Sequence, residues 1–238
     1  MNTGVFILMD RILFLDNSIK NDLYRPLNYW EPLMMFDFDT YRASAGQLPD
    51  DLDGYYHIFI SGSTASVLDN SDWILAEQEL VRMAVDQGKV IVGSCFGHQL
   101  IARALFGDGA VRKRPALDVG WPEIEILADD ALLGEAGSKI HGYVFHYDEV
   151  CEVDKSQAAV IARSDACEIL AFKLKDRPVW GIQPHFEMGI VEGLKFIELV
   201  KGDGVPERQS FLNSTEKLPK DSGWIIPLMK AYHQIRPL

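Results

Sequence analysis

The segment that most constrains this chain is an apolar run that ends at a cysteine flanked by glycines. Val90-Ile91-Val92 is typical of a buried strand, and it leads directly into Gly93-Ser94-Cys95-Phe96-Gly97. Helical spacing follows from His98 and ends near Gly107. A strand that turns sharply into a helix needs small flanking residues, because the backbone there is strained and closely packed. The pattern predicts a nucleophile elbow, a tight strand–helix turn that presents Cys95.

A helix that begins just after Cys95 favours a reactive thiol at that position. The positive end of the helix dipole stabilises a thiolate. The N–H of Phe96 would face the oxyanion that forms when the sulfur attacks a carbonyl. A buried core cysteine is the ordinary alternative, but the two glycines and the apolar strand favour the nucleophile. Cys151 and Cys167 lack such surroundings, and we interpret both as structural.

A thiolate nucleophile needs a base, and the best candidate lies ninety positions downstream. An apolar strand over 179–182 is followed by His185 and Glu187. In extended backbone, side chains two positions apart share a face, so Glu187 could bond one imidazole nitrogen while the other faces Cys95. His98 and His146 are alternative bases. We expect His98 to be structural and His146 to line the site.

Apolar runs and helical segments alternate along the first half of the chain, which predicts a mostly parallel sheet covered by helices. Shorter strands in the second half predict a region of mixed sheet. We find no repeat or linker, so residues 11–200 are expected to form one domain and 201–238 an extension packed on it. The expected strands are 12–15, 33–41, 57–60, 90–92, 123–127, 142–145, 159–162, 169–173 and 179–182, and the expected helices are 73–86, 98–105, 189–200 and 225–235.

The composition excludes several classes of protein. The net charge of −12 argues against nucleic acid or an anionic membrane as the main partner. Three cysteines without a CxxC pair indicate a reducing compartment, and we expect a cytoplasmic protein without a metal or cofactor. The apolar run over 5–9 is too short for a membrane span, and residues 1–8 are a possible extension. The basic triplet over 112–114 is interpreted as a solvated loop, with an anionic ligand or a partner as the alternative.

Four segments together resemble the class I (triad-type) glutamine amidotransferases. They are GSCFGHQ at 93–99, GIQPHFE at 181–187, the loop over 59–67 and the FHYDEV segment at 145–150. The resemblance covers about residues 11–200. It implies a flavodoxin-like three-layer α/β sandwich, in which a mostly parallel central sheet has helices on both faces, plus a small mixed-sheet region.

The resemblance also assigns roles to residues of this sequence. It makes Cys95 the nucleophile, His185 the base and Glu187 the residue that orients it. The backbone of Phe96, Gly62 and Ser63 would form the oxyanion hole, and Gln99, His146 and Tyr147 would contact the substrate. The sequence departs from the family pattern in two places: Pro184 precedes the histidine where a proline usually follows it, and Ser63 replaces a common glycine.

The activity that the resemblance implies is hydrolysis of the glutamine side-chain amide through a γ-glutamyl thioester on Cys95. Ammonia would pass to an unknown acceptor, as in the glutaminase domain of GMP synthase. No synthetase domain or GxxxxGK[ST] loop is present, so the acceptor enzyme would be a separate subunit. Three alternatives stay open: a γ-glutamyl peptidase acting on glutathione-like compounds, a non-catalytic regulatory subunit, and a cysteine hydrolase with a different histidine arrangement.

Overall fold

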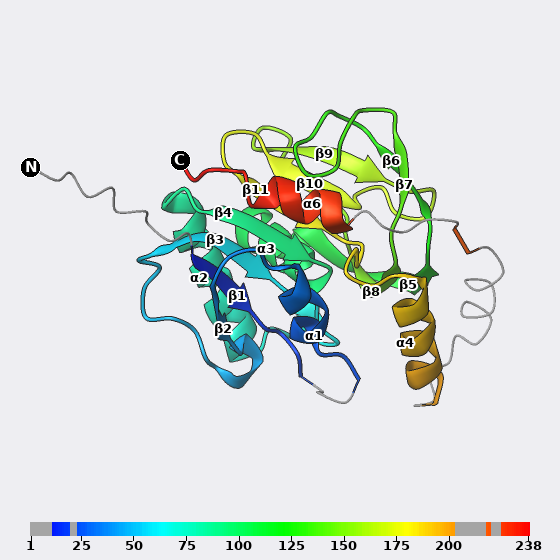
Figure 1. The fold of residues 1–238 in the computed structure, drawn as a ribbon, viewed down its shortest axis with the longest axis horizontal. Coiled ribbons are helices and arrows are strands. Elements are labelled where there is room, and N and C mark those ends of the chain that lie inside the picture. The colour runs from blue at the N-terminus through cyan, green and yellow to red at the C-terminus, as the bar shows by residue number, and fades with distance from the viewer. Residues whose placement is uncertain (1–10, 20–22, 203–217, 220–224) are drawn as a thin grey trace, which may run out of the picture.

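The structure, a computed structural model, describes residues 11–19, 23–202, 218–219 and 225–238. Its centre is a nine-stranded sheet in the order β2-β1-β3-β4-β11-β10-β9-β6-β7 (Figure 1). The first five strands in this order run parallel to one another, as the alternation of apolar runs and helices predicts. These parallel strands are β2 (Phe38–Tyr41), β1 (Arg11–Leu15), β3 (Tyr55–Ile60), β4 (Val90–Ser94) and β11 (Val179–Ile182).

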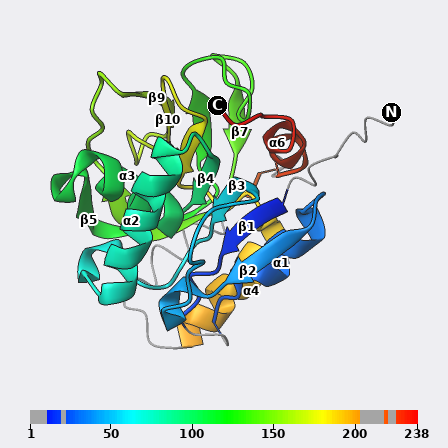
Figure 2. The ribbon, with the colours of Figure 1, turned by 90° about the vertical axis from the view of Figure 1, so that its left-hand side faces the viewer.

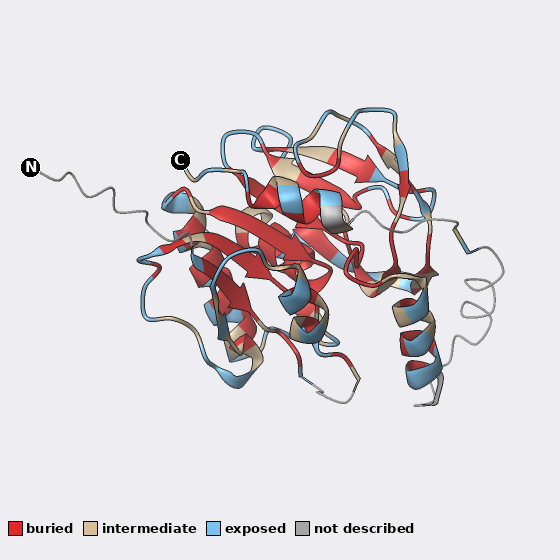
Figure 3. Ribbon diagram, in the orientation of Figure 1, coloured by how far each residue is buried: buried red, intermediate tan, exposed pale blue. Residues whose placement is uncertain are grey.

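Helices of the described part of the chain lie on both faces of the parallel strands (Figure 2). Strand side chains alternate between the faces: Leu13 packs in the core cluster of one face, and Phe14 packs in that of the other. Both faces of the central strands are therefore buried, while the helices expose their outer surfaces (Figure 3). The helices are α2 (Asp72–Asp86) and α3 (Phe96–Phe106) on the Leu13 face, and α1 (Pro26–Trp30) and α6 (Ile225–Tyr232) on the Phe14 face.

The second half of the chain adds antiparallel strands, and these include two elements that the sequence did not predict. The four strands that extend the main sheet are β10 (Ala171–Leu174), β9 (Ala158–Arg163), β6 (Glu123–Ile126) and the unpredicted β7 (Lys139–His141). A separate two-stranded ribbon pairs the unpredicted β5 (Val111–Gly120) with β8 (Val144–Val150). The flavodoxin-like sandwich with a small additional sheet is thus confirmed.

The basic triplet lies in β5, so its interpretation as a solvated loop was wrong. Arg112 and Arg114 both form ion pairs with Glu149 of the neighbouring β8. Lys113 is the register partner of Asp148 and points to the other face of the ribbon. Three consecutive charged residues interrupt the apolar pattern from which the other strands were predicted.

Boundaries of the remaining elements differ modestly from the prediction. The strand expected over 33–41 begins only at Phe38, because Glu31–Leu33 forms a 3-10 turn after α1. Helix α4 (Ile190–Gly202) packs on an aromatic cluster beside the β5–β8 ribbon. Residues 1–8 lie outside the described part of the chain, as does most of 203–224. The other 3-10 turns are Ala43–Ala45, Val67–Asp69 and Asp108–Ala110.

The sheet brings the functional segments of the sequence to one edge. Four parallel strands (β1, β3, β4 and β11) end there, and the chain continues into Asn17, Ser61, Cys95 and His185 respectively. Ligand sites of open α/β sheets lie outside the carboxyl ends of their strands.

No helix in the described residues is long and apolar enough to cross a membrane.

Candidate active site

Cys95 occupies a strained position between β4 and α3. Its φ of 50° and ψ of −102° lie where L-residues rarely fall. The strain is held by close packing: a Cβ on Gly93 would lie 2.5 Å from the carbonyl carbon of Gly97. A Cβ on Gly97 would lie 2.4 Å from the carbonyl oxygen of Ile60 on β3. Glycine is required at both positions, and the sharp turn predicted from the sequence is the one observed.

His185 and Glu187 form a hydrogen-bonded pair beside Cys95. The Nδ1 atom of His185 lies 2.7 Å from Oε1 of Glu187, and both side chains are buried. The backbone differs from the extended segment expected: it turns, with Met188 N–H donating to the His185 carbonyl at 3.1 Å. The His185 N–H donates to the Tyr143 carbonyl at 2.7 Å, which anchors the turn to the segment before β8.

A tyrosine that the sequence analysis missed completes this hydrogen-bonded group. The Tyr24 hydroxyl donates to Oε1 of Glu187 at 2.7 Å and lies 3.3 Å from Nδ1 of His185. Its ring stands edge-on to the imidazole, with centroids 5.5 Å apart. Tyr24 belongs to the loop before α1 and is 163 positions from Glu187. No local motif marks it, because only the fold brings the two segments together.

The charges of the site favour a protonated imidazole. Burial alone lowers the pKa of His185, but Cys95 and Glu187 raise it well above its ordinary value by charge and by hydrogen bonding. Burial and the Glu187 carboxylate raise the pKa of Tyr24, so its hydroxyl stays neutral and donates. A protonated imidazole between a cysteine sulfur and a carboxyl group is the arrangement expected of a cysteine nucleophile with its base.

The loop after β3 lies against the imidazole and has its own buried support. A Cβ on Gly62 would come within 2.8 Å of Cε1 of His185, so glycine permits this approach. Ser63 has an ordinary negative φ, and its hydroxyl donates to the Asn17 carbonyl at 2.6 Å. Replacement of the common glycine by Ser63 is therefore accommodated. The Asn17 side chain in turn donates to the buried carboxyl of Glu77 on α2 at 3.1 Å.

Cys95 and His185 open onto a cavity of about 650 Å³. The three substrate-contact residues of the sequence prediction, Gln99, His146 and Tyr147, all line it, as does Ser63. Gln99 donates its amide to the Asp148 carbonyl at 2.8 Å and to Gln183 at 3.0 Å, so its orientation is set by the protein.

The residues predicted to form the oxyanion hole lie in two different elements, the first turn of α3 and the loop after β3. Phe96 is the first residue of α3, where backbone N–H groups have no partner inside the helix. Its ring faces away from the cavity and stacks on Trp73 with centroids 5.4 Å apart. The Gly62–Ser63 backbone lies on the His185 side of Cys95. The assignment of these N–H groups to the oxyanion stays a prediction.

The alternative histidines have different surroundings. His98 is fully buried against Phe172 and does not line the cavity, and burial lowers its pKa to about 3. His146 has Nδ1 2.8 Å from the Asp148 carbonyl oxygen and Nε2 3.4 Å from the Asp118 carboxylate. Of the three histidines, His185 is the one whose side chain interacts with both Cys95 and a carboxylate, so it stays the candidate base.

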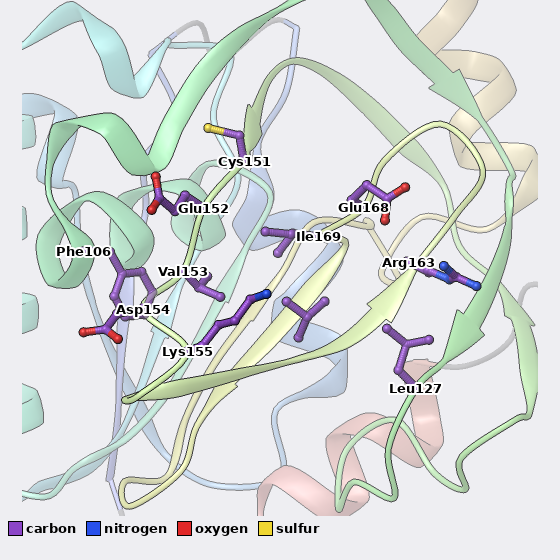
Figure 4. Close-up of a pocket in the computed structure, with 11 residues that line it drawn as sticks. Phe106, Leu127, Cys151, Glu152, Val153, Asp154, Lys155, Arg163, Glu168 and Ile169 are labelled. Carbon is purple, nitrogen blue, oxygen red and sulfur yellow. The ribbon is translucent and has the colours of Figure 1, made fainter.

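Cys151 lines a second cavity, of about 780 Å³, with ten other residues (Figure 4). Its sulfur lies 3.4 Å from the Gly109 carbonyl oxygen. The described lining of this cavity contains no histidine, so it lacks the usual base for a cysteine nucleophile. Burial raises the pKa of Cys167 to about 11, which keeps that thiol protonated. Within the described residues, no group of three or more His, Cys, Asp or Glu side chains could hold a metal ion.

Comparison with known proteins identifies the family. A family model described as "Glutamine amidotransferase class-I" matches residues 14–195. The chain belongs to the class I glutamine amidotransferase family.

Its curated relatives include two kinds of protein. Gamma-glutamyl peptidase 4 of Arabidopsis thaliana is 33% identical over 145 residues, which cover 58% of this chain and 57% of the peptidase. A glutamine-hydrolysing GMP synthase subunit of Methanothermobacter thermautotrophicus is 39% identical over 98 residues, covering 41% of this chain and 51% of the subunit. The matched region therefore spans little more than half the length of either relative.

Solved structures share the fold over nearly the whole chain. A glutamine amidotransferase of Thermotoga maritima has a TM-score of 0.74 at 18% identity, covering 95% of this chain and 99% of the other. A glutamine amidotransferase of Methylobacillus flagellatus has a TM-score of 0.71 at 18% identity, covering 95% and 94%. At this identity the likeness concerns the fold.

Proposed function

We propose that this protein hydrolyses the γ-amide bond of glutamine or of a γ-glutamyl compound with a Cys95-His185-Glu187 triad. The observation that carries the proposal is the meeting of a strained cysteine with the hydrogen-bonded His185–Glu187 pair at one cavity. Strain of this kind costs of the order of 1–3 kcal/mol and persists where it has a use. Family membership agrees with this chemistry.

The reaction follows from the positions of these groups. The Cys95 thiolate attacks the γ-carbonyl carbon, and the N–H groups of Phe96 and the Gly62–Ser63 loop stabilise the oxyanion. His185 donates its proton to the leaving nitrogen as the carbon–nitrogen bond breaks, which leaves a γ-glutamyl thioester on Cys95. Water then attacks the thioester while His185 accepts its proton, the carbon–sulfur bond breaks, and glutamate is released as the thiolate and the protonated imidazole are regenerated.

The polar wall of the cavity suits the amino-acid end of a γ-glutamyl group. Lys113 and Asp148 both line this wall, and their opposite charges interact. Asp148 also accepts a hydrogen bond from Ser66 at 2.5 Å. Lys113 would pair with the α-carboxylate of the substrate, and the carboxylate of Asp148 with its α-ammonium group. Lys113 was foreseen only as a member of the basic triplet.

Two substrates fit this chemistry, and relatives support both. With glutamine the leaving group is ammonia, which a separate synthetase subunit would receive, as the name of the GMP synthase relative suggests. A γ-glutamyl peptidase instead releases an amino acid or peptide, and peptidases of this name are 33–34% identical over the matched segments. We place both reactions at the same triad.

The first experiment tests the triad itself. The purified chain is incubated with glutamine and with γ-glutamyl dipeptides, and the glutamate released is measured. We expect Cys95→Ala to abolish release from every substrate and Cys151→Ala to retain wild-type rates. A diazo-ketone analogue of glutamine should label Cys95, as read by mass spectrometry. Full turnover by Cys95→Ala would overturn the assignment, and an intact chain that neither turns over nor becomes labelled would indicate a regulatory subunit.

A further inference from the structure

The cavity at Cys95 has two chemically different walls. The polar wall is organised around Asp148, which contacts Ser66 and Gln99. A second wall belongs to the aromatic cluster that packs on α4. Its cavity-lining members are Tyr24, Tyr143, Phe145, Tyr147, Met188, Phe196 and Val200.

The triad geometry decides which part of a substrate faces the apolar wall. His185 must reach the leaving nitrogen to donate its proton, so the leaving group lies on the His185 side of the scissile bond. That side is apolar: the imidazole stands edge-on to Tyr24, and the Tyr143 ring centroid lies 6.3 Å from it. Met188 follows in the same turn. The γ-glutamyl group then extends the other way, toward Gln99 and Asp148.

The aromatic wall is preformed and continuous. Phe145 meets Phe196 edge-to-face with centroids 5.1 Å apart, and Phe196 meets Tyr24 at 6.1 Å. A cavity of about 650 Å³ exceeds what glutamine fills, since cavities of about 300–1,000 Å³ hold drug-sized ligands. Ammonia as a leaving group would make no use of the apolar surface, whereas a large apolar amine would bury it.

This wall also contains a polar atom without a hydrogen-bond partner in the described part of the chain, the Tyr143 hydroxyl oxygen. The Tyr143 side chain is fully buried, and its hydroxyl has no hydrogen-bond partner among the described residues. Burial raises the pKa of Tyr143, so the group is a neutral donor. A buried donor without a partner is costly, and a ligand that accepts its hydrogen bond removes the cost.

From these features we infer that the preferred substrate is a γ-glutamyl amide whose leaving amine is large and apolar and carries a hydrogen-bond acceptor for Tyr143. A γ-glutamyl dipeptide with an aromatic or large aliphatic second residue has this chemistry. The inference rests on the proposed function, because it uses the same triad. Cys95 attacks the γ-carbonyl, His185 protonates the departing amine, and water hydrolyses the thioester.

The test compares substrates that differ only in the leaving group. We expect kcat/KM for γ-glutamyl-phenylalanine to exceed that for γ-glutamyl-glycine and for glutamine by about 10-fold or more, as an apolar pocket discriminates. Phe145→Ala should lower kcat/KM for γ-glutamyl-phenylalanine about 10-fold more than it lowers that for glutamine. Phe145→Leu, which keeps apolar bulk, should recover most of this difference.

The control is Val191→Ala, on the exposed side of α4, which should match the wild type with both substrates. Equal kcat/KM values for all three substrates would overturn the inference and leave the triad in place. An equal fall in kcat/KM for γ-glutamyl-phenylalanine and for glutamine in Phe145→Ala would do the same. That outcome would instead fit a wall that contacts a partner protein. Turnover by Cys95→Ala would overturn the proposed function itself.

Discussion

The two sides of the active site are built in different ways. The side that carries the proposed nucleophile comes from consecutive residues, 93–99, at the junction of β4 and α3. The side that carries the proposed base combines Tyr24, Tyr143, His185 and Glu187, which come from three distant parts of the chain. Steric exclusion holds the first side, and hydrogen bonds between remote segments hold the second. The surroundings of the proposed nucleophile are thus set by neighbouring residues, whereas those of the proposed base depend on the whole fold.

The nucleophile side depends on the close approach of the Gly97 and Ile60 backbones. Of the substitutions considered, Gly97→Ala should therefore lower the free energy of unfolding most. The added Cβ would lie 2.4 Å from the Ile60 carbonyl oxygen, and backbone atoms of a central strand cannot easily move. We expect a loss of about 3 kcal/mol in the free energy of unfolding, with activity lost in parallel.

Gly109→Ala is the matched control, because a Cβ there meets nothing within 4 Å. Urea denaturation of both variants would check the prediction. If Gly97→Ala were as stable and active as Gly109→Ala, the steric account of the elbow would fail.

The Glu77 carboxyl tests whether charge matters in the support of the loop after β3, which lies against the imidazole on the other side of the site. Burial raises its pKa from 4.5 to about 8, opposed by the hydrogen bond from Asn17. Because the folded state holds this proton more tightly than the unfolded chain, its contribution to stability is complete below about pH 4.5. That contribution is lost as the pH rises through about 8.

Glu77→Gln removes this ionisation, so the free energy of unfolding of the variant should rise relative to that of the wild type by about 2 kcal/mol between pH 5 and about pH 6.5. Chemical denaturation at both pH values measures the change. Glu79→Gln, on the exposed side of the same helix, should track the wild type at each pH. A constant difference between Glu77→Gln and the wild type would show that Glu77 is not a titrating buried acid.

Tyr24→Phe tests the base side with the smallest change, the loss of one hydroxyl. The hydroxyl donates to Glu187 at 2.7 Å, and hydrogen bonds to charged groups are worth about 1.5–3 kcal/mol. We expect kcat/KM for γ-glutamyl substrates to fall about 10-fold and the melting temperature to fall by several degrees, because the same buried bond stabilises the fold.

Tyr29→Phe is the natural comparison, since that ring stacks on Tyr24 with centroids 5.9 Å apart. It should keep wild-type kinetics. Equal kinetics for the two variants would mean that Glu187 orients the imidazole without help from Tyr24.

Much of the fold was readable in the sequence because its central strands are buried on both faces. The apolar runs at 12–15, 57–60, 90–92 and 179–182 all became parallel strands, since a strand covered by helices on both sides must be apolar throughout. Strand β5 was missed for the opposite reason. Its ribbon lies apart from the main sheet, and charged residues such as Arg112 and Arg114 are satisfied by the neighbouring strand.

In the candidate site, too, residues in a local sequence motif were predicted and residues brought in by the fold were not. His185 and Glu187 were found because a short motif contains both, although the backbone between them forms a turn and not the extended segment expected. The place of Lys113 in the cavity was not predicted, because it belongs to a run of three charged residues whose side chains point to alternate faces of the ribbon. Tyr24 gave no signal, because a tyrosine in a polar loop becomes significant only through what it contacts.

By itself, the sequence determined the elbow and the parallel core, because glycine spacing and continuous apolar runs act on neighbouring residues. Only the tertiary structure decided which side chains meet at Cys95. Tyr24, Lys113 and the aromatic wall reach the cavity from β5, β8, α4 and the loop before α1. Such contacts depend on how distant segments pack, and no local sequence pattern predicts them.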